Sequence, residues 1–162
     1  MNPQFVIVMG VSGSGKSTIG MALAKAKNWP FYDADDFHPP ANVEKMSAGQ
    51  PLNDQDRLPW LQSLHQHIRI QLEAGNCGVL ACSALKQSYR DLLKGELHAV
   101  HFVYLEGSFD LIHARMKARS DHYMPASLLQ SQFDALEVPE QAIKIPITLP
   151  PQQMIEEILG HL

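Results

Sequence analysis

The sequence predicts an α/β fold in which a five-stranded parallel sheet is flanked by helices on both faces. Five short apolar segments are typical of buried strands, and they lie at residues 5–9, 29–32, 78–82, 99–105 and 143–147. Between them are segments whose apolar residues recur at helical spacing. Because strands and helices alternate along the chain, right-handed crossovers are expected to make the sheet parallel.

The first half of the chain contains a short predicted helix and a long one. The short helix covers residues 42–48 and ends at Gly49. The long helix begins near Asn53, and Gly75 ends it. Its apolar stripe is interpreted as core and consists of Trp60, Leu61, Leu64, Ile68 and Leu72.

Further helices are predicted in the second half of the chain. One follows the third strand and runs through Leu93, and Ser108 caps the next one. Another covers residues 127–136. A closing helix over residues 152–159 is expected to end at Gly160.

Composition limits the class of protein. The chain has 162 residues, 45% of them hydrophobic, which suits a single domain spanning residues 1–162. The formal net charge of −4 argues against nucleic acid or an anionic membrane as a partner, and no run approaches the ~20 apolar residues of a membrane span. The first four residues lack the basic start of a signal peptide, and Cys77 and Cys82 are expected to be free thiols. A cytoplasmic location is therefore predicted.

Residues 10–17 match the phosphate-loop pattern G-x-x-x-x-G-K-[ST], between the first strand and a helix predicted over residues 18–27. Its glycines let backbone N–H groups approach phosphate oxygens, and the helix N-terminus adds a positive dipole end. Lys16 supplies a cation for the β- and γ-phosphates, and the Ser17 hydroxyl can ligate Mg²⁺. The residues predicted to bind the phosphates of ATP are Gly10, Ser12, Gly13, Ser14, Gly15, Lys16, Ser17 and Thr18.

Two carboxylates follow the second strand, where open α/β sheets place their ligands. Asp33 and Asp35 are two residues apart and share a face if the strand persists. Asp35 is expected to orient an attacking hydroxyl or accept its proton. Because the strand over residues 78–82 ends in Cys-Ser rather than in an acid, Mg²⁺ would depend on Ser17, water and Asp35, the last directly or through water. Loop capping is the alternative role of the two aspartates.

Phosphoryl transfer also needs cations for the migrating charge and a lid that excludes water. Arg115 and Arg119 lie four residues apart on one helix face, and residues 119–127 are the candidate lid. The alternative for the two arginines is a solvated basic helix end. These features favour a small kinase over a large ATPase.

Several blocks of the sequence resemble the gluconate kinase (gluconokinase) family. The resemblance extends from about residue 5 to residue 139. It implies ATP-dependent, Mg²⁺-requiring phosphorylation of D-gluconate to 6-phosphogluconate on a fold like that of the nucleoside monophosphate kinases. It also implies a cytoplasmic role and, often, a homodimer. The blocks that carry it are residues 33–39, 42–46, 49–60, 82–86, 89–92, 122–125, 128–133 and 136–139.

Gluconate has a carboxylate and a row of hydroxyls, so its pocket should pair a cation with several hydrogen-bonding groups. The acceptor-binding region is expected at about residues 33–60. Arg57 or Arg90 is expected to bind the carboxylate, because arginine binds carboxylates through two hydrogen bonds. His38 is expected near the reacting hydroxyl. The predicted substrate-binding residues are Asp33, Asp35, His38, Lys45, Arg57, Lys86 and Arg90, and a solvated surface remains an equal alternative for both lysines.

The family resemblance also suggests roles for the two arginines before the candidate lid. Arg115 would stack on adenine, and Arg119 would reach the phosphates and act in catalysis together with Lys16 and Asp35. Two other functions remain open: a shikimate- or nucleotide-type kinase on the same fold, and a nucleotide-binding module without catalysis.

Overall fold

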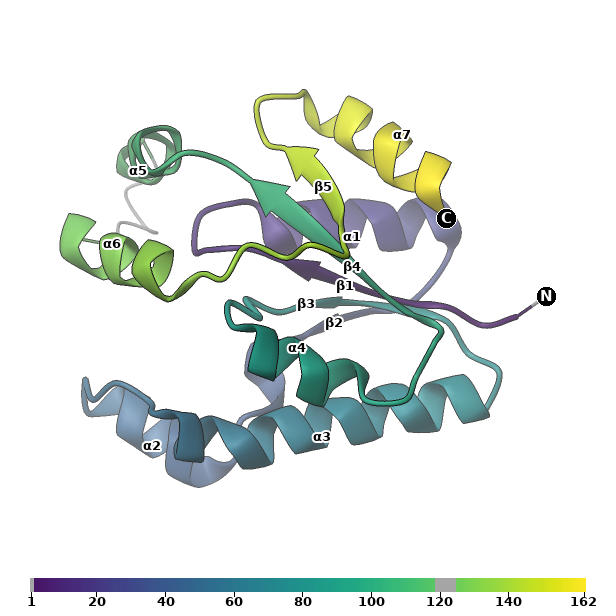
Figure 1. Cartoon of the computed structure of the whole chain (residues 1–162), viewed down its shortest axis with the longest axis horizontal. Helices are drawn as coiled ribbons and strands as arrows, with labels where there is room; N and C mark the ends of the chain where they lie inside the picture. Colours follow the sequence, from purple (N-terminus) through teal and green to yellow (C-terminus); the bar gives the residue numbers. More distant parts are fainter. Residues whose placement is uncertain (1, 119–124) are drawn as a thin grey trace.

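The computed structural model describes residues 2–118 and 125–162 and contains one parallel five-stranded sheet (Figure 1). The order across the sheet is β2-β3-β1-β4-β5. This arrangement confirms the predicted α/β fold, and every predicted strand is present. The strands are β1 (Phe5–Met9), β2 (Phe31–Asp33), β3 (Gly78–Ala81), β4 (Val100–Glu106) and β5 (Ile143–Pro146).

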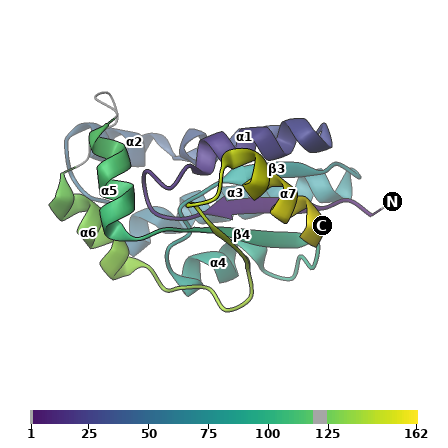
Figure 2. The same ribbon diagram turned by 90° about the horizontal axis from the view of Figure 1, so that it is seen from above.

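Helices cover both faces of the sheet. On one face lie α1 (Lys16–Lys27) and α7 (Pro151–His161), and on the other lie α3 (Asp54–Glu73) and α4 (Gln87–Lys94) (Figure 1). The remaining helices gather at the end of the sheet opposite the N-terminus, where the strands have their carboxyl ends (Figure 2). They are α2 (Pro40–Ser47), α5 (Phe109–Lys117) and α6 (Ala126–Ala135).

The central strand β1 is buried along its whole length. Its residues alternate between two apolar cores, with Val6 and Val8 packed in one and Phe5, Ile7 and Met9 in the other. Full burial of side chains of this size stabilises the fold by about 1.5–3 kcal/mol each. The buried strand β1 therefore fixes the start of the segment that follows it, residues 10–15.

Two predicted helix starts have the expected caps. The Asn53 side chain accepts a hydrogen bond from the N–H of Asp56 while the Asp56 carboxylate accepts one from the N–H of Asn53, a capping box. Ser108 Oγ accepts from the N–H of Leu111 at 3.2 Å. The predicted end at Gly160 is wrong, because Gly160 does not adopt a positive φ and α7 continues to His161.

None of the helices within residues 2–118 and 125–162 has both the length and the apolar character needed to cross a bilayer. Cys77 and Cys82 are both free, as predicted. Burial raises the pKa of the Cys82 thiol to about 12, so Cys82 remains protonated and is not a nucleophile.

Candidate active site

The phosphate loop, residues 10–15, connects β1 to α1 at the carboxyl end of the sheet. Gly13 and Gly15 have φ angles of 80° and 99°, a backbone region that residues other than glycine rarely adopt. A Cβ at Gly13 would also lie 2.7 Å from Met116 Cγ, whereas a Cβ at Gly15 would meet nothing within 4 Å. Backbone conformation therefore requires glycine at both positions, and close packing requires it additionally at Gly13.

Lys16 is the first residue of α1, and its ammonium folds back onto the loop. Its Nζ donates a hydrogen bond to the carbonyl oxygen of Val11 at 3.0 Å. Burial lowers the pKa of Lys16, and the carboxylates of Asp35 and Asp33 act in the opposite direction. The ammonium is thus placed between the phosphate loop and an acidic pair.

A cavity of about 530 Å³ lies between the phosphate loop and the carboxyl ends of β2 and β3; we call it the acceptor-side cavity. Its size is within the range of small-molecule sites. Lys16 and Ser17 line it from the loop and α1, and Asp33, Asp35 and Trp60 line it from the other side. The structure therefore brings together the cation and the acidic pair that the sequence predicted.

The condition under which Asp33 and Asp35 would share one face, a strand that continues to Asp35, is not met. The strand β2 ends at Asp33, and a 3₁₀ turn, η1 (Ala34–Phe37), follows it. Asp33 caps this turn, because its Oδ1 accepts a hydrogen bond from the N–H of Asp35 at 2.9 Å. Desolvation and then the charge of Asp33 raise the pKa of Asp35, and the 85% exposure of its side chain weakens both effects.

His38 lies behind Asp35, with its Nε2 3.9 Å from Asp35 Oδ1. Asn42 Nδ2 lies 3.2 Å from His38 Nδ1 and also donates to the Asp56 carbonyl, and because an amide nitrogen only donates, Nδ1 accepts. The Nε2 atom of neutral His38 therefore carries the proton and faces Asp35. Burial lowers the pKa of His38, which favours this neutral form.

Trp60 supports the same region, a role that its position in an apolar stripe did not reveal. Its ring stacks on the His38 ring, with centroids 4.2 Å apart and planes 16° apart. Its indole Nε1 donates to the carbonyl of Ala34 at 2.7 Å. Trp60 is thus both a core residue and a wall of the acceptor-side cavity.

The predicted cations Arg57, Lys45 and Lys86 have different surroundings. Arg57 Nη1 donates to Tyr89 Oη at 3.1 Å, and its charge, after burial, contributes to the lowered pKa of His38. Lys45 pairs with Asp56 at 2.6 Å, and Lys86 pairs with Asp54 at 3.3 Å. Arg57 Nη1 also lies 3.9 Å from Asp54 Oδ1, so all three cations have an acidic partner near the start of α3, and none of the three lines the acceptor-side cavity.

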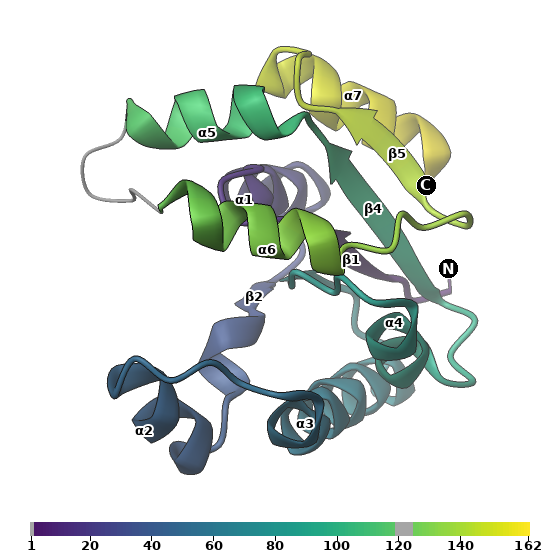
Figure 3. The same ribbon diagram turned by 60° about the vertical axis from the view of Figure 1, so that its left-hand side comes forward.

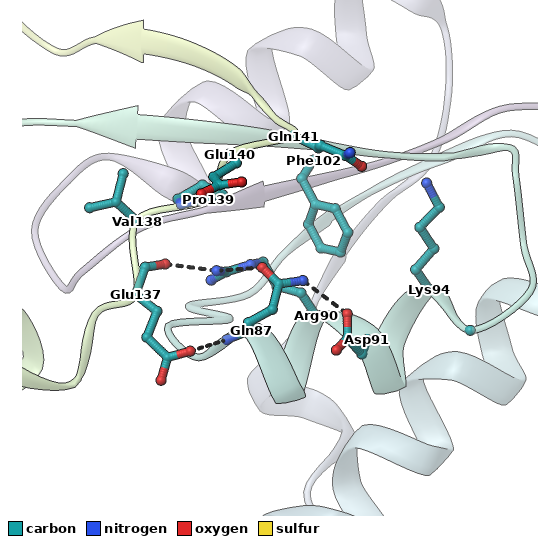
Figure 4. Close-up of a pocket in the computed structure, with 11 residues that line it drawn as sticks. Gln87, Arg90, Asp91, Lys94, Phe102, Glu137, Val138, Pro139, Glu140 and Gln141 are labelled. Atoms are coloured by element: carbon teal, nitrogen blue, oxygen red, sulfur yellow. Dashed lines mark hydrogen bonds between the residues drawn. The ribbon is translucent and has the colours of Figure 1, made fainter.

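Arg90, the other arginine predicted to bind the carboxylate, lies apart from the acceptor-side cavity. Its residue is 3% exposed, and it does not line the acceptor-side cavity. Its guanidinium donates to the Ala84 carbonyl at 2.7 Å and to the Glu137 carbonyl at 2.7 Å, and Figure 4 shows it between Gln87 and Glu137. Ala84, which accepts one of these bonds, has a left-handed conformation with φ 46°, and Arg90 lines a separate cavity of about 780 Å³.

A cavity of about 350 Å³ lies on the other side of the phosphate loop; we call it the C-terminal cavity. Ile147, Leu149 and Met154 give it apolar walls, and Arg115 lies at its edge. Arg115 Nη2 donates to the Ile147 carbonyl at 2.9 Å. Arg119 and residues 119–124 of the candidate lid lie outside the described residues.

Gln132 of α6 is a further contact of the phosphate loop that the sequence did not indicate. Its Oε1 accepts from the N–H of Ser12 at 2.7 Å, and its Nε2 donates to Ser12 Oγ at 3.0 Å. A contact across 120 residues has no local sequence signal. Figure 3 shows α6 running beside α5 at this end of the sheet.

The donors in the acceptor-side cavity suit a magnesium ion that also binds phosphates and water. Ser17, Asp33 and Asp35 line one cavity. Within the described part of the chain, no cluster of three or more His, Cys, Asp or Glu side chains could hold a metal by itself. Mg²⁺ commonly takes one or two protein oxygens and completes its shell with phosphates and water, so these residues fit it.

Comparison with known proteins identifies the family to which a chain with this geometry is similar. Residues 12–142 match the family profile described as shikimate kinase. A gluconokinase from Gluconobacter oxydans is 47% identical over 164 residues, covering 99% of this chain and 92% of the relative. The crystal structure of a gluconokinase from Sinorhizobium meliloti superposes with a TM-score of 0.86 at 42% identity, covering 98% of this chain and 90% of that one. Shikimate kinase from Aquifex aeolicus shares the fold, with a TM-score of 0.62 at 17% identity, covering 98% and 95% of the two chains.

Proposed function

Because the chain belongs to the gluconokinase family of P-loop kinases, we propose that it transfers the γ-phosphoryl group of ATP to D-gluconate, giving 6-phospho-D-gluconate. One structural observation supports this proposal independently of the family assignment. A single cavity has the phosphate loop with Lys16 on one side and Asp33 and Asp35 on the other. A phosphoryl donor and a hydroxyl acceptor can therefore meet there.

In the proposed reaction, the phosphate loop and Lys16 bind the β- and γ-phosphates of ATP. Asp35 aligns the acceptor hydroxyl or accepts its proton, and His38 Nε2 lies 3.9 Å from the Asp35 carboxylate, beyond hydrogen-bond distance. Ser17 and Asp35 would hold Mg²⁺, directly or through water, and the ion would neutralise charge on the phosphates. Lys16 stabilises the charge that spreads over the transferred oxygens.

We propose that Arg57 binds the gluconate carboxylate. It is the predicted arginine that lies beside His38 and Tyr89 rather than in the separate cavity of Arg90. Arginine presents two parallel N–H donors to a carboxylate. Lys45 and Lys86 would act on the substrate-binding region indirectly, by holding the carboxylates of Asp56 and Asp54 with which they pair.

The adenine ring is proposed to occupy the C-terminal cavity. Its apolar walls suit the faces of a purine, and Arg115 at its edge can stack on the ring. Arg119 is proposed to reach the phosphates, and the segment 119–127 is proposed as the lid. A cytoplasmic location and a homodimer are also proposed, and light scattering of the purified protein tests the dimer.

The match to the shikimate kinase profile supports one alternative, phosphorylation of shikimate on the same fold. A coupled ADP-release assay distinguishes the possibilities, with gluconate, shikimate and nucleoside monophosphates as acceptors. The proposal predicts ADP release that depends on gluconate. Activity with shikimate or a monophosphate alone contradicts it, and ATP binding without any acceptor-dependent turnover indicates a non-catalytic module.

A further inference from the structure

We propose that Gln132 is a positioning residue that holds the Ser12 hydroxyl with its proton directed toward the transferred phosphoryl group. This assignment rests on the proposed function, because it concerns a step of that reaction. It begins from the two hydrogen bonds that join α6 to the phosphate loop.

The orientation of the Gln132 amide is fixed by the chemistry of its partner. The backbone N–H of Ser12 can only donate, so the atom 2.7 Å from it is the amide oxygen. The amide nitrogen then faces Ser12 Oγ, at 3.0 Å, and donates to it. Both ends of the amide are therefore used by one residue of the loop.

This arrangement determines what the Ser12 hydroxyl can do next. A hydroxyl has one proton to donate and can accept through its lone pairs. Since Oγ accepts from Gln132, its own proton remains available, and Oγ makes no other hydrogen bond within residues 2–118 and 125–162. An anion placed beside Ser12 would receive a short, charge-assisted hydrogen bond.

The position of Ser12 identifies which phosphate this anion is. Ser12, Lys16 and Ser17 line the acceptor-side cavity and do not line the C-terminal cavity. Gly13, Gly15 and Thr18 line both cavities. Ser12 thus lies at the end of the loop where the proposed reaction places the transferred phosphoryl group.

Packing of two neighbouring residues fixes the part of α6 that carries Gln132. Leu129, three residues earlier, is fully buried. Phe133, the next residue, packs edge-on against Phe109 of α5, with ring centroids 5.8 Å apart. A donor on an anchored helix, held by two hydrogen bonds, loses little entropy when it acts, which is the requirement for a preorganised site.

The same helix provides a matched control, Gln130. It is exposed, and its amide Nε2 donates to Asp134 on the helix surface at 2.9 Å. The test compares Gln132→Ala, Gln132→Glu and Gln130→Ala by steady-state kinetics and by calorimetric binding of ADP and a non-hydrolysable ATP analogue. Glutamate keeps the shape of glutamine but cannot donate, so the Ser12 hydroxyl must turn its proton toward the carboxylate.

We expect both Gln132 variants to lower kcat by about tenfold or more, with the KM for gluconate unchanged, and Gln130→Ala to resemble the wild type. Both Gln132 variants should bind the ATP analogue more weakly and ADP normally, because the lost contact is to the terminal phosphate. Ser12→Ala should reproduce the defect, and the double variant Ser12→Ala/Gln132→Ala should be no worse than the more impaired single variant.

Three results would overturn the assignment: full kcat in Gln132→Glu, equal weakening of ADP and analogue binding, or additive losses in the double variant. A purely structural contact would give the first, and additive losses would show that Ser12 and Gln132 act independently. The binding measurements do not need an acceptor, so they test Gln132 even where gluconate is not the substrate. Absence of gluconate phosphorylation by the wild type would instead contradict the proposed function.

Discussion

The Asp33 carboxylate accepts a hydrogen bond from the backbone N–H of Asp35, so one acid of the pair positions the other. This bond caps the 3₁₀ turn η1 and directs the chain after β2 along the acceptor-side cavity. The two residues also interact through charge, because Asp33 is the second cause, after desolvation, of the raised pKa of Asp35. Geometry and ionisation at Asp35 can therefore be separated by mutation.

Asp33→Asn is expected to move the acidic limb of the pH–rate profile to lower pH. In the proposed reaction the ionised form of Asp35 acts on the hydroxyl, so activity should fall as pH drops through its raised pKa. Asparagine removes the like charge and thus lowers that pKa, while its Oδ1 still accepts the N–H of Asp35. The profile of kcat/KM measures the shift.

Asp36→Asn is the control for this experiment, because Asp36 is the last and weakest cause of the shift at Asp35. The acidic limb of the Asp36→Asn profile should also move to lower pH, by less than that of Asp33→Asn. A shift of the Asp33→Asn profile to higher pH, or one no larger than that of the control, contradicts ionised Asp35 as the aligning group.

Lys16→Ala is expected to lower kcat by about a hundredfold or more, because it removes a charge aimed at the transferred phosphoryl group. Thermal unfolding should show that the fold survives. Lys25→Ala, an exposed position on the same helix, provides the control and should leave turnover unchanged. Turnover in Lys16→Ala equal to that control would exclude Lys16 from the mechanism.

Arg57→Ala should raise the KM for gluconate by about 10- to 100-fold while the KM for ATP changes little, since a charged hydrogen-bond partner of the carboxylate is lost. The control is Arg69→Ala, which removes a partly exposed arginine on the same helix that donates to Gln66. Equal KM values for gluconate in the two variants would place the carboxylate elsewhere.

Arg90→Ala should lower the free energy of unfolding by about 2–4 kcal/mol, because it leaves the Ala84 and Glu137 carbonyls without their buried donor. Chemical denaturation measures this loss. Arg90→Lys, which lacks the planar fork, should restore only part of the stability. A stable Arg90→Ala protein with a selectively raised KM for gluconate would return Arg90 to the substrate site.

The strands, most helices and the phosphate loop were predictable because their signals are local. Apolar runs, an Asn–Asp capping box and the glycines of the loop act within a few residues. Whether the second strand continued to Asp35 could not be read from the sequence, because the Asp33 side chain caps a turn there and this turn competes with the strand. Burial of Arg90 and the Gln132–Ser12 contact depend on segments far apart in the chain, and residue type alone does not indicate them.

The most direct test of the account is a crystal structure of the protein with a non-hydrolysable ATP analogue and D-gluconate. It should show the terminal phosphate on the phosphate loop, the 6-hydroxyl of gluconate facing it beside Asp35, and the carboxylate at Arg57. Gluconate bound outside the acceptor-side cavity, for example in the cavity lined by Arg90, would contradict the account.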